Sequence, residues 1–197
     1  MASSGSFGIS APITGARDEA AAYRGKSVAA CILGLKKTNV SQRRAAAWAL
    51  FGMGAAAAAA AESLALLLDD PEVRVPALRA LEAIGPEAVL AVPALTRLLT
   101  HSDFYIRFGA MLTLAEIGCP LDKREIGGKR MPSTHAAVVS ESLVIAFLDE
   151  FPTIAHEAAE VMAAFGSFAR PALQPAIEML DHADPGRQIG ALRVITA

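Results

Sequence analysis

The stretch DDPEVRVPALRALEAIG, residues 69–85, has the start signal, the apolar stripe and the stop signal of one amphipathic helix. Asp70 is a good N-cap because its carboxylate can accept a hydrogen bond from a free backbone N–H of the first turn. Pro71 suits the first helical position, where no N–H is needed. Gly85 ends the helix, since glycine adopts the left-handed C′ conformation without strain. The apolar stripe between these signals consists of Val73, Ala77, Leu81 and Ile84.

A second helix follows this one after a short turn. Pro86 cannot continue the first helix, and Pro93 opens a new run whose apolar stripe includes Leu95, Leu98 and Leu99. The unit is therefore a helix A, a tight turn and a helix B.

The same unit recurs along the chain. A glycine follows a large apolar residue at Gly54, Gly85, Gly118 and Gly166, with spacings of 31, 33 and 48 residues. Repeats of this length that each contain two helices stack into a solenoid, because one unit cannot bury its apolar face alone. We therefore predict an all-α, right-handed α-solenoid of about 4.5 helical hairpins. Helix A of each unit should line the convex side and helix B the concave side.

The repeat register also predicts the domain organisation. Residues 1–16 are expected to be a flexible tail without a signal peptide, and residues 17–197 a single repeat domain. The expected parts are a capping helix at 17–38, units at 39–69, 70–102, 103–150 (with an inserted loop at 119–134) and 151–183, and a partial unit at 184–197. One column of helix B, four residues before each unit start, is apolar throughout and predicts buried core positions. This column consists of Leu35, Leu66, Leu99, Phe147 and Leu180.

Composition restricts the partners. The net charge is −2, which gives no overall field to attract nucleic acid or anionic lipid. The two cysteines, Cys31 and Cys119, form no CxxC motif and are expected to be reduced thiols of a cytoplasmic protein. Residues 45–61 carry no charge, but Gly54 divides them, so we expect two packed helices there and no membrane span.

Residues 69–85, followed by AVPALTRLLTHSD at 91–103, resemble the HEAT repeat in its short bacterial form associated with phycobilin lyases. The resemblance extends over about 39–195. Repeats of this kind serve as scaffolds, lyase subunits, hydroxylases and DNA-binding proteins, so the resemblance specifies the fold better than the function. It implies helix caps and an Asp-to-Arg ladder of ion pairs between neighbouring units. The matching positions are Asp70, Asp103, Arg43, Arg74 and Arg107.

The third unit contains an insertion, CPLDKREIGGKRMPST at 119–134, with a local charge balance of +2. Insertions in solenoids fall in loops on one face, often the binding face. A neutral, drifted surface loop is the alternative interpretation. The positive loop and the concave surface around Glu62, Thr96 and Arg97 predict contact with another protein, one with an acidic surface. The predicted partner-binding residues are Arg97, Lys123, Arg124, Lys129 and Arg130.

No catalytic constellation is present in the sequence, and we expect no cofactor and no metal. His156-Glu157 resembles the His-Glu motif of the deoxyhypusine hydroxylase repeats, but no second pair accompanies it, and a di-iron site needs several. The main prediction is a non-catalytic protein-interaction module or scaffold. The alternatives are a subunit of a bilin lyase or of another HEAT-repeat enzyme, and a weak nucleic-acid binder. The C-terminal end, with Leu192 and Ile195, is expected to be an association site.

Overall fold

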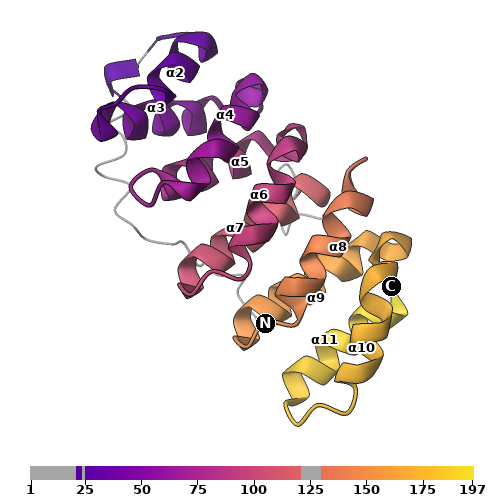
Figure 1. Cartoon of the computed structure of the whole chain (residues 1–197). Coiled ribbons are helices and arrows are strands. Elements are labelled where there is room, and N and C mark those ends of the chain that lie inside the picture. Colours follow the sequence, from indigo (N-terminus) through magenta and orange to yellow (C-terminus); the bar gives the residue numbers. More distant parts are fainter. Residues whose placement is uncertain (1–20, 24, 121–129) are drawn as a thin grey trace, which may run out of the picture.

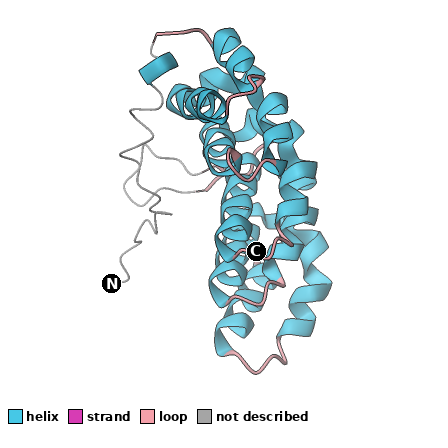
Figure 2. Ribbon diagram, turned by 60° about the vertical axis from the view of Figure 1, so that its left-hand side comes forward, coloured by secondary structure: helices cyan, strands magenta, loops and turns pink. Residues whose placement is uncertain are grey.

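The computed structural model describes residues 21–23, 25–120 and 130–197, and this part of the chain consists of helices and turns without a strand. The helices follow one another along a single direction (Figure 1) and stack in two columns (Figure 2). The predicted all-α solenoid is therefore confirmed. The predicted tail at 1–16 lies outside the described residues.

One layer contains the A helices. They are α3 (Val40–Met53), α5 (Arg74–Ile84), α7 (Phe104–Gly118), α9 (Pro152–Phe165) and α11 (Pro185–Thr196). Consecutive A helices pack against each other, most extensively α3 against α5 and α9 against α11. Their buried apolar side chains form one continuous core with those of the B layer.

The other layer contains the B helices, most of which begin with a 3₁₀ segment directly after the unit's glycine. These are η2 (Gly54–Ala60) with α4 (Ala61–Leu66) and η3 (Leu67–Asp69), η4 (Gly85–Ala91) with α6 (Val92–Leu98), and η5 (Gly166–Ala172) with α10 (Leu173–Met179). In the third unit the B helix is a single α-helix, α8 (Ala136–Phe147). A short η1 (Ala21–Tyr23) and α2 (Val28–Leu35) precede the first unit.

The glycines of the repeat fall into two physical classes. Gly54, Gly85 and Gly166 have φ of 55°, 74° and 55°, a conformation that glycine adopts without strain. Gly118 instead lies inside α7, where a Cβ would approach Phe165 Cζ to 2.8 Å and Val139 Cβ to 2.9 Å. The sequence-based interpretation that each glycine marks the turn between helices A and B is therefore wrong at Gly118, where close helix packing requires it.

The predicted capping helix at 17–38 is too long. Its described part contains α2, which begins at Val28 behind the N-cap Ser27, whose hydroxyl accepts from Ala30 N at 3.3 Å. Gly25 adopts φ 73°, which breaks any helix running into Ser27.

One predicted core position is also wrong. Leu66 is 75 % exposed, whereas Leu68 is fully buried. The reason is the spacing of 31 residues in the first unit against 33 in the second. The turn between units is two residues shorter there, so Leu68, counted from Gly54, is the equivalent of the buried Leu99, counted from Gly85. The column should be aligned on the preceding glycine, not on the following unit start.

The predicted caps form at the unit starts, with one shift. Asn39, Asp103 and Asp184 are N-caps whose side chains accept from a first-turn N–H. Asp70 Oδ1 accepts from Glu72 N at 3.0 Å, but this bond closes a turn, and α5 begins only at Arg74. The Asp70 carbonyl accepts from both Val73 N and Arg74 N, which joins the turn to the helix.

One segment, Val40–Asp69, is long and apolar enough to cross a membrane by length and composition. In the structure, Gly54 ends α3 after 14 residues and the chain reverses into the B layer. A helix needs about 20 residues to span a bilayer. The predicted turn at Gly54 between two packed helices is confirmed.

Candidate functional site

An arginine four residues after the unit start joins neighbouring units at the first boundary. Arg43 Nη1 donates to the carbonyls of Lys37 and Thr38, at 3.0 and 2.8 Å, and Arg43 Nη2 lies 2.7 Å from Asp70 Oδ2. The guanidinium hydrogen bond holds the pKa of Asp70 below its usual range. The arginine therefore satisfies turn carbonyls of its own unit and the carboxylate of the next.

The third unit repeats this arrangement in a more buried form. Arg107 Nη1 donates to the carbonyls of His101 and Ser102, and its Nε and Nη2 donate to the two oxygens of Asp149 at 2.7 and 3.2 Å. Bonding to Asp149 raises the pKa of Arg107 despite its burial. The guanidinium also lies 5.1 Å from the centre of the Phe151 ring.

The second boundary departs from the predicted ladder. Arg74 Nε donates to the Leu68 carbonyl at 2.6 Å, and its Nη1 lies 3.1 Å from His101 Nε2. Asp103 does not meet Arg74. It caps α7 through Tyr105 N and forms no ion pair in the described part of the chain. The ladder prediction therefore holds for Arg43 and Arg107, whereas His101 replaces the acid opposite Arg74.

The ladder is interrupted in the fourth unit, where Ala155 stands in place of the arginine. The carbonyls five and six residues before it belong to Glu150 and Asp149. Arg187, from α11 of the following unit, donates to both through Nη2, at 3.0 and 2.6 Å. A neighbouring unit thus supplies the donor that the fourth unit lacks.

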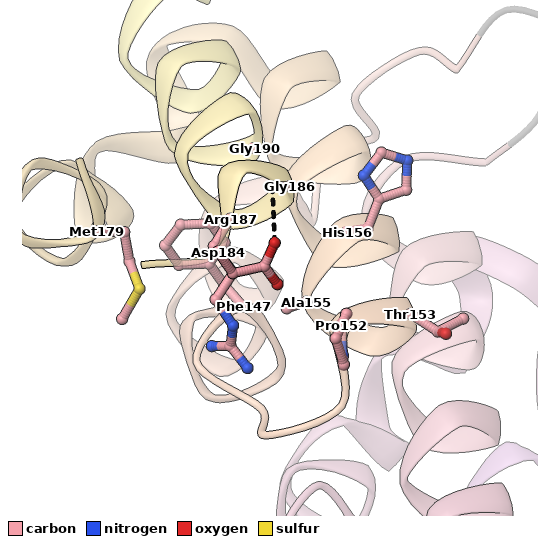
Figure 3. Close-up of a pocket in the computed structure, with 10 residues that line it drawn as sticks. All are labelled: Phe147, Pro152, Thr153, Ala155, His156, Met179, Asp184, Gly186, Arg187 and Gly190. Carbon is pink, nitrogen blue, oxygen red and sulfur yellow. Dashed lines mark hydrogen bonds between the residues drawn. The ribbon is translucent and has the colours of Figure 1, made fainter. Parts of the chain in front are cut away.

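A cavity of about 410 Å³ lies beside Ala155, between the N-terminal ends of α9 and α11. Figure 3 shows Arg187 and Asp184 entering this space near Phe147, while the His156 ring points away from them. Asp184 Oδ1 accepts from Gly186 N at 2.8 Å. The lining residues are Phe147, Pro152, Thr153, Ala155, His156, Met179, Asp184, Gly186, Arg187 and Gly190. Sequence analysis missed this cavity. Its signal was the alanine in the arginine column.

The predicted partner-binding residues are distributed unevenly. Arg97 is exposed in the B layer and lies 3.5 Å from Asp69. Arg130 is 20 % exposed, pairs with Glu116 at 3.2 Å and donates to the Cys119 carbonyl at 2.7 Å. The other members, Lys123, Arg124 and Lys129, lie outside the described residues. Of the two concave-surface candidates, Glu62 is exposed, and Thr96 donates to the Val92 carbonyl and lies 2.7 Å from Ser142 Oγ.

The B layer presents one continuous exposed surface, which we call the B face. It consists of the positions 5, 8, 12 and 15 residues after each glycine, a helical spacing that places them on one side. In the third unit the register is set by Phe147, the buried equivalent of Leu99. All of these positions are exposed: Ala59, Glu62, Leu66, Asp69; Leu90, Pro93, Arg97, Thr100; Val138, Glu141, Ile145, Leu148; Pro171, Gln174, Glu178 and Asp181.

The B face is apolar and acidic. Half of its positions are apolar, and the largest exposed fractions are 75 % at Leu66, 67 % at Leu90 and 55 % at Val138. Its charged residues are five acids and one arginine, and that arginine, Arg97, already faces Asp69. At its N-terminal end, α2 continues the apolar row with Leu33 and adds two exposed lysines, Lys26 and Lys36.

The other candidates for chemistry have ordinary surroundings. His156 Nε2 lies 3.8 Å from Glu160, which also pairs with Arg193, and among the described residues no group of three or more His, Cys, Asp or Glu side chains gathers to hold a metal ion. Cys31 and Cys119 are buried and free. Burial raises the pKa of Cys31, and it raises the pKa of Cys119 to about 11, so neither thiol is activated as a nucleophile.

The C-terminal helix has an exposed apolar side. Leu192 and Ile189 are each 50 % exposed, while Ile195 is partly buried against the core. Sequence analysis therefore named Leu192 correctly as exposed but missed Ile189.

Comparison with known proteins supports a HEAT-repeat protein. The family model of HEAT repeats matches residues 61–126. No curated protein matches the chain. The predicted narrower form, that of the phycobilin lyases, is not among these findings.

Solved structures share the fold over nearly the whole chain. One engineered protein has a TM-score of 0.64 and 23% identity, covering 93% of this chain and 88% of its own. Another engineered protein has a TM-score of 0.59 and 24% identity, with 93% and 90% covered. A designed armadillo repeat protein in complex with the peptide (KR)4 has a TM-score of 0.62 and 18% identity, with 93% and 91% covered. At these identities the likeness concerns the fold, an armadillo- or HEAT-like helical solenoid.

Proposed function

We propose that the protein is a non-catalytic protein-interaction module that binds its partner along the B face. The observation that carries this proposal is the continuous exposed stripe in which half of the positions are apolar. Exposed apolar surface of this extent costs solubility unless a partner covers it, and such patches mark interaction sites. HEAT- and armadillo-like repeats commonly serve as interaction scaffolds, and the designed armadillo neighbour was solved with a bound peptide.

The charges of the B face favour a partner segment that is basic and apolar. Four acids, Glu62, Glu141, Glu178 and Asp181, have no cationic partner among the ion pairs of the described residues, so an incoming lysine or arginine can pair with them. The expectation of an acidic partner rested on the inserted loop at 119–134, whose charge has the opposite sign. In our proposal that loop is secondary, because Arg130 is engaged with Glu116.

The test is a comparison of proteins captured by the wild type and by two variants. Leu90→Glu and Ile145→Glu each place a charge at an exposed apolar position of the B face, and surface changes of this kind leave stability within about 0.5 kcal/mol. Tyr105→Glu is the matched control, because Tyr105 is 62 % exposed on the A helix α7. We expect both B-face variants to lose the same partner at least about tenfold, which corresponds to about 1.4 kcal/mol.

The control should retain that partner. Equal capture by wild type, Leu90→Glu and Ile145→Glu would remove the B face from the proposal. Loss with Tyr105→Glu alone would move the interaction to the A layer.

A further inference from the structure

The cavity beside Ala155 lies at the place in the fourth unit where the first and third units hold a guanidinium. Arg43 and Arg107 each extend from the corresponding position of helix A toward an acid near the start of the next unit. Ala155 leaves that place empty of side chain, and the remaining space of about 410 Å³ can contain a small polar group with an aliphatic stem.

The acid that would receive such a group is present. Asp184 occupies the unit-start position that Asp70 occupies at the first boundary. The Oδ1 atoms of both accept from the N–H two residues onward, at 2.8 Å in Asp184 and 3.0 Å in Asp70. Asp70 Oδ2 binds Arg43, whereas Asp184 forms no ion pair within the described part of the chain. Asp184 Oδ2 is therefore an available carboxylate oxygen at the mouth of the cavity.

The walls suit the stem of an arginine. Phe147, Pro152 and Met179 line the cavity with apolar atoms, against which methylene groups can pack. Arg187 already donates to the Asp149 and Glu150 carbonyls, so Asp184 is the charged partner left for an incoming cation. The Arg187 charge opposes that cation, which limits the affinity.

We propose that this cavity binds a guanidinium group, as the arginine side chain of a partner polypeptide or as free arginine. A planar guanidinium can donate two parallel hydrogen bonds to a carboxylate, which an ammonium group cannot. None of the lining residues belongs to the B face, so the proposal is independent of the function proposed above.

The probe is the blocked peptide acetyl-Gly-Arg-Gly-amide, titrated into the full chain and followed by NMR chemical shifts. Its citrulline counterpart has nearly the same shape without the charge, and free L-arginine distinguishes an amino-acid ligand from a peptide. We expect saturable binding of the arginine peptide with Kd of about 1 mM, and binding of the citrulline peptide at least about tenfold weaker, as for loss of a charge-assisted hydrogen bond. Tighter binding of free L-arginine than of the peptide would assign the site to the amino acid, within the same proposal.

Two variants test the location. Asp184→Asn keeps an acceptor for Gly186 N and removes the charge, so it should weaken binding at least about tenfold. Ala155→Arg refills the column with the chain's own guanidinium, so it should abolish binding and raise the Tm. Asp103→Asn is the matched control, because Asp103 caps α7 in the same way and does not line the cavity. It should bind like the wild type.

Unchanged binding by Asp184→Asn, equal binding of the arginine and citrulline peptides, or no saturation below about 10 mM would each overturn the proposal. These results are informative even if Ala155→Arg does not fold.

Discussion

The guanidinium of Arg107 and the carboxylate of Asp149 form a buried ion pair, with side chains 7 % and 6 % exposed and 2.7 Å between Nε and Oδ2. The pair joins the start of α7 to the turn before α9, across 42 residues of sequence. Asp149 also accepts from Phe151 N at 2.9 Å, so one carboxylate holds both the arginine and the backbone of the next unit's start.

Removing the charge of Asp149 should be strongly destabilising. Asp149→Asn keeps an acceptor for Phe151 N but leaves the buried Arg107 without its main counter-charge, which costs about 3–5 kcal/mol. Urea unfolding measures the free-energy difference. The double variant Arg107→Met/Asp149→Asn should be less destabilised than the sum of the two single variants, because the double change leaves no unpaired charge. Strictly additive losses would show that the two groups do not interact energetically.

The Arg43–Asp70 pair should make stability depend on acid pH. The pKa of Asp70 is lower in the folded state than in the unfolded chain. Its contribution is therefore fully present above the unfolded-state pKa of about 3.9 and is lost as the pH falls through the folded-state value. We expect the stability difference between wild type and Asp70→Asn to be constant from pH 7 to about pH 5 and to shrink below about pH 4. Chemical unfolding at each pH measures it, and a constant difference down to pH 2.5 would contradict the linkage.

Leu66 and Leu68 should respond oppositely to truncation, although both belong to the same leucine run. Leu68→Ala leaves a cavity in the core and should cost about 2–5 kcal/mol. Leu66→Ala removes a side chain that is 75 % exposed and should change stability by less than about 0.5 kcal/mol. Thermal and urea unfolding of the two variants are enough to compare them. A larger loss for Leu66→Ala would restore the register predicted from the sequence.

Gly118→Ala should destabilise the protein by about 1–3 kcal/mol through overpacking. The added Cβ would meet Phe165 and Val139 at under 3 Å. Shortening the opposing side chain with Phe165→Leu should recover part of that loss in the double variant. Gly52→Ala is the control, since its Cβ would meet nothing within 4 Å inside α3. It should be neutral or stabilising by up to about 1 kcal/mol, as expected for alanine in a helix. No rescue by Phe165→Leu would remove the packing explanation.

The sequence by itself determined the helical repeat, the turns at Gly54, Gly85 and Gly166, and most of the caps. These features depend on local physical chemistry: the period of the apolar residues, the freedom of glycine at positive φ and the short side chains that accept from a free N–H. The arginine column was also visible as a pattern.

Only the tertiary structure decided what lies across each unit boundary. It placed His101 opposite Arg74, buried Leu68 in place of Leu66, and filled the gap at Ala155 from the other side with Arg187. These outcomes depend on the lengths of turns and on the approach of helices distant in sequence, which local propensity does not encode. The B face and the cavity beside Ala155 arise in the same way, because each is made by residues of successive units that only their stacking brings together.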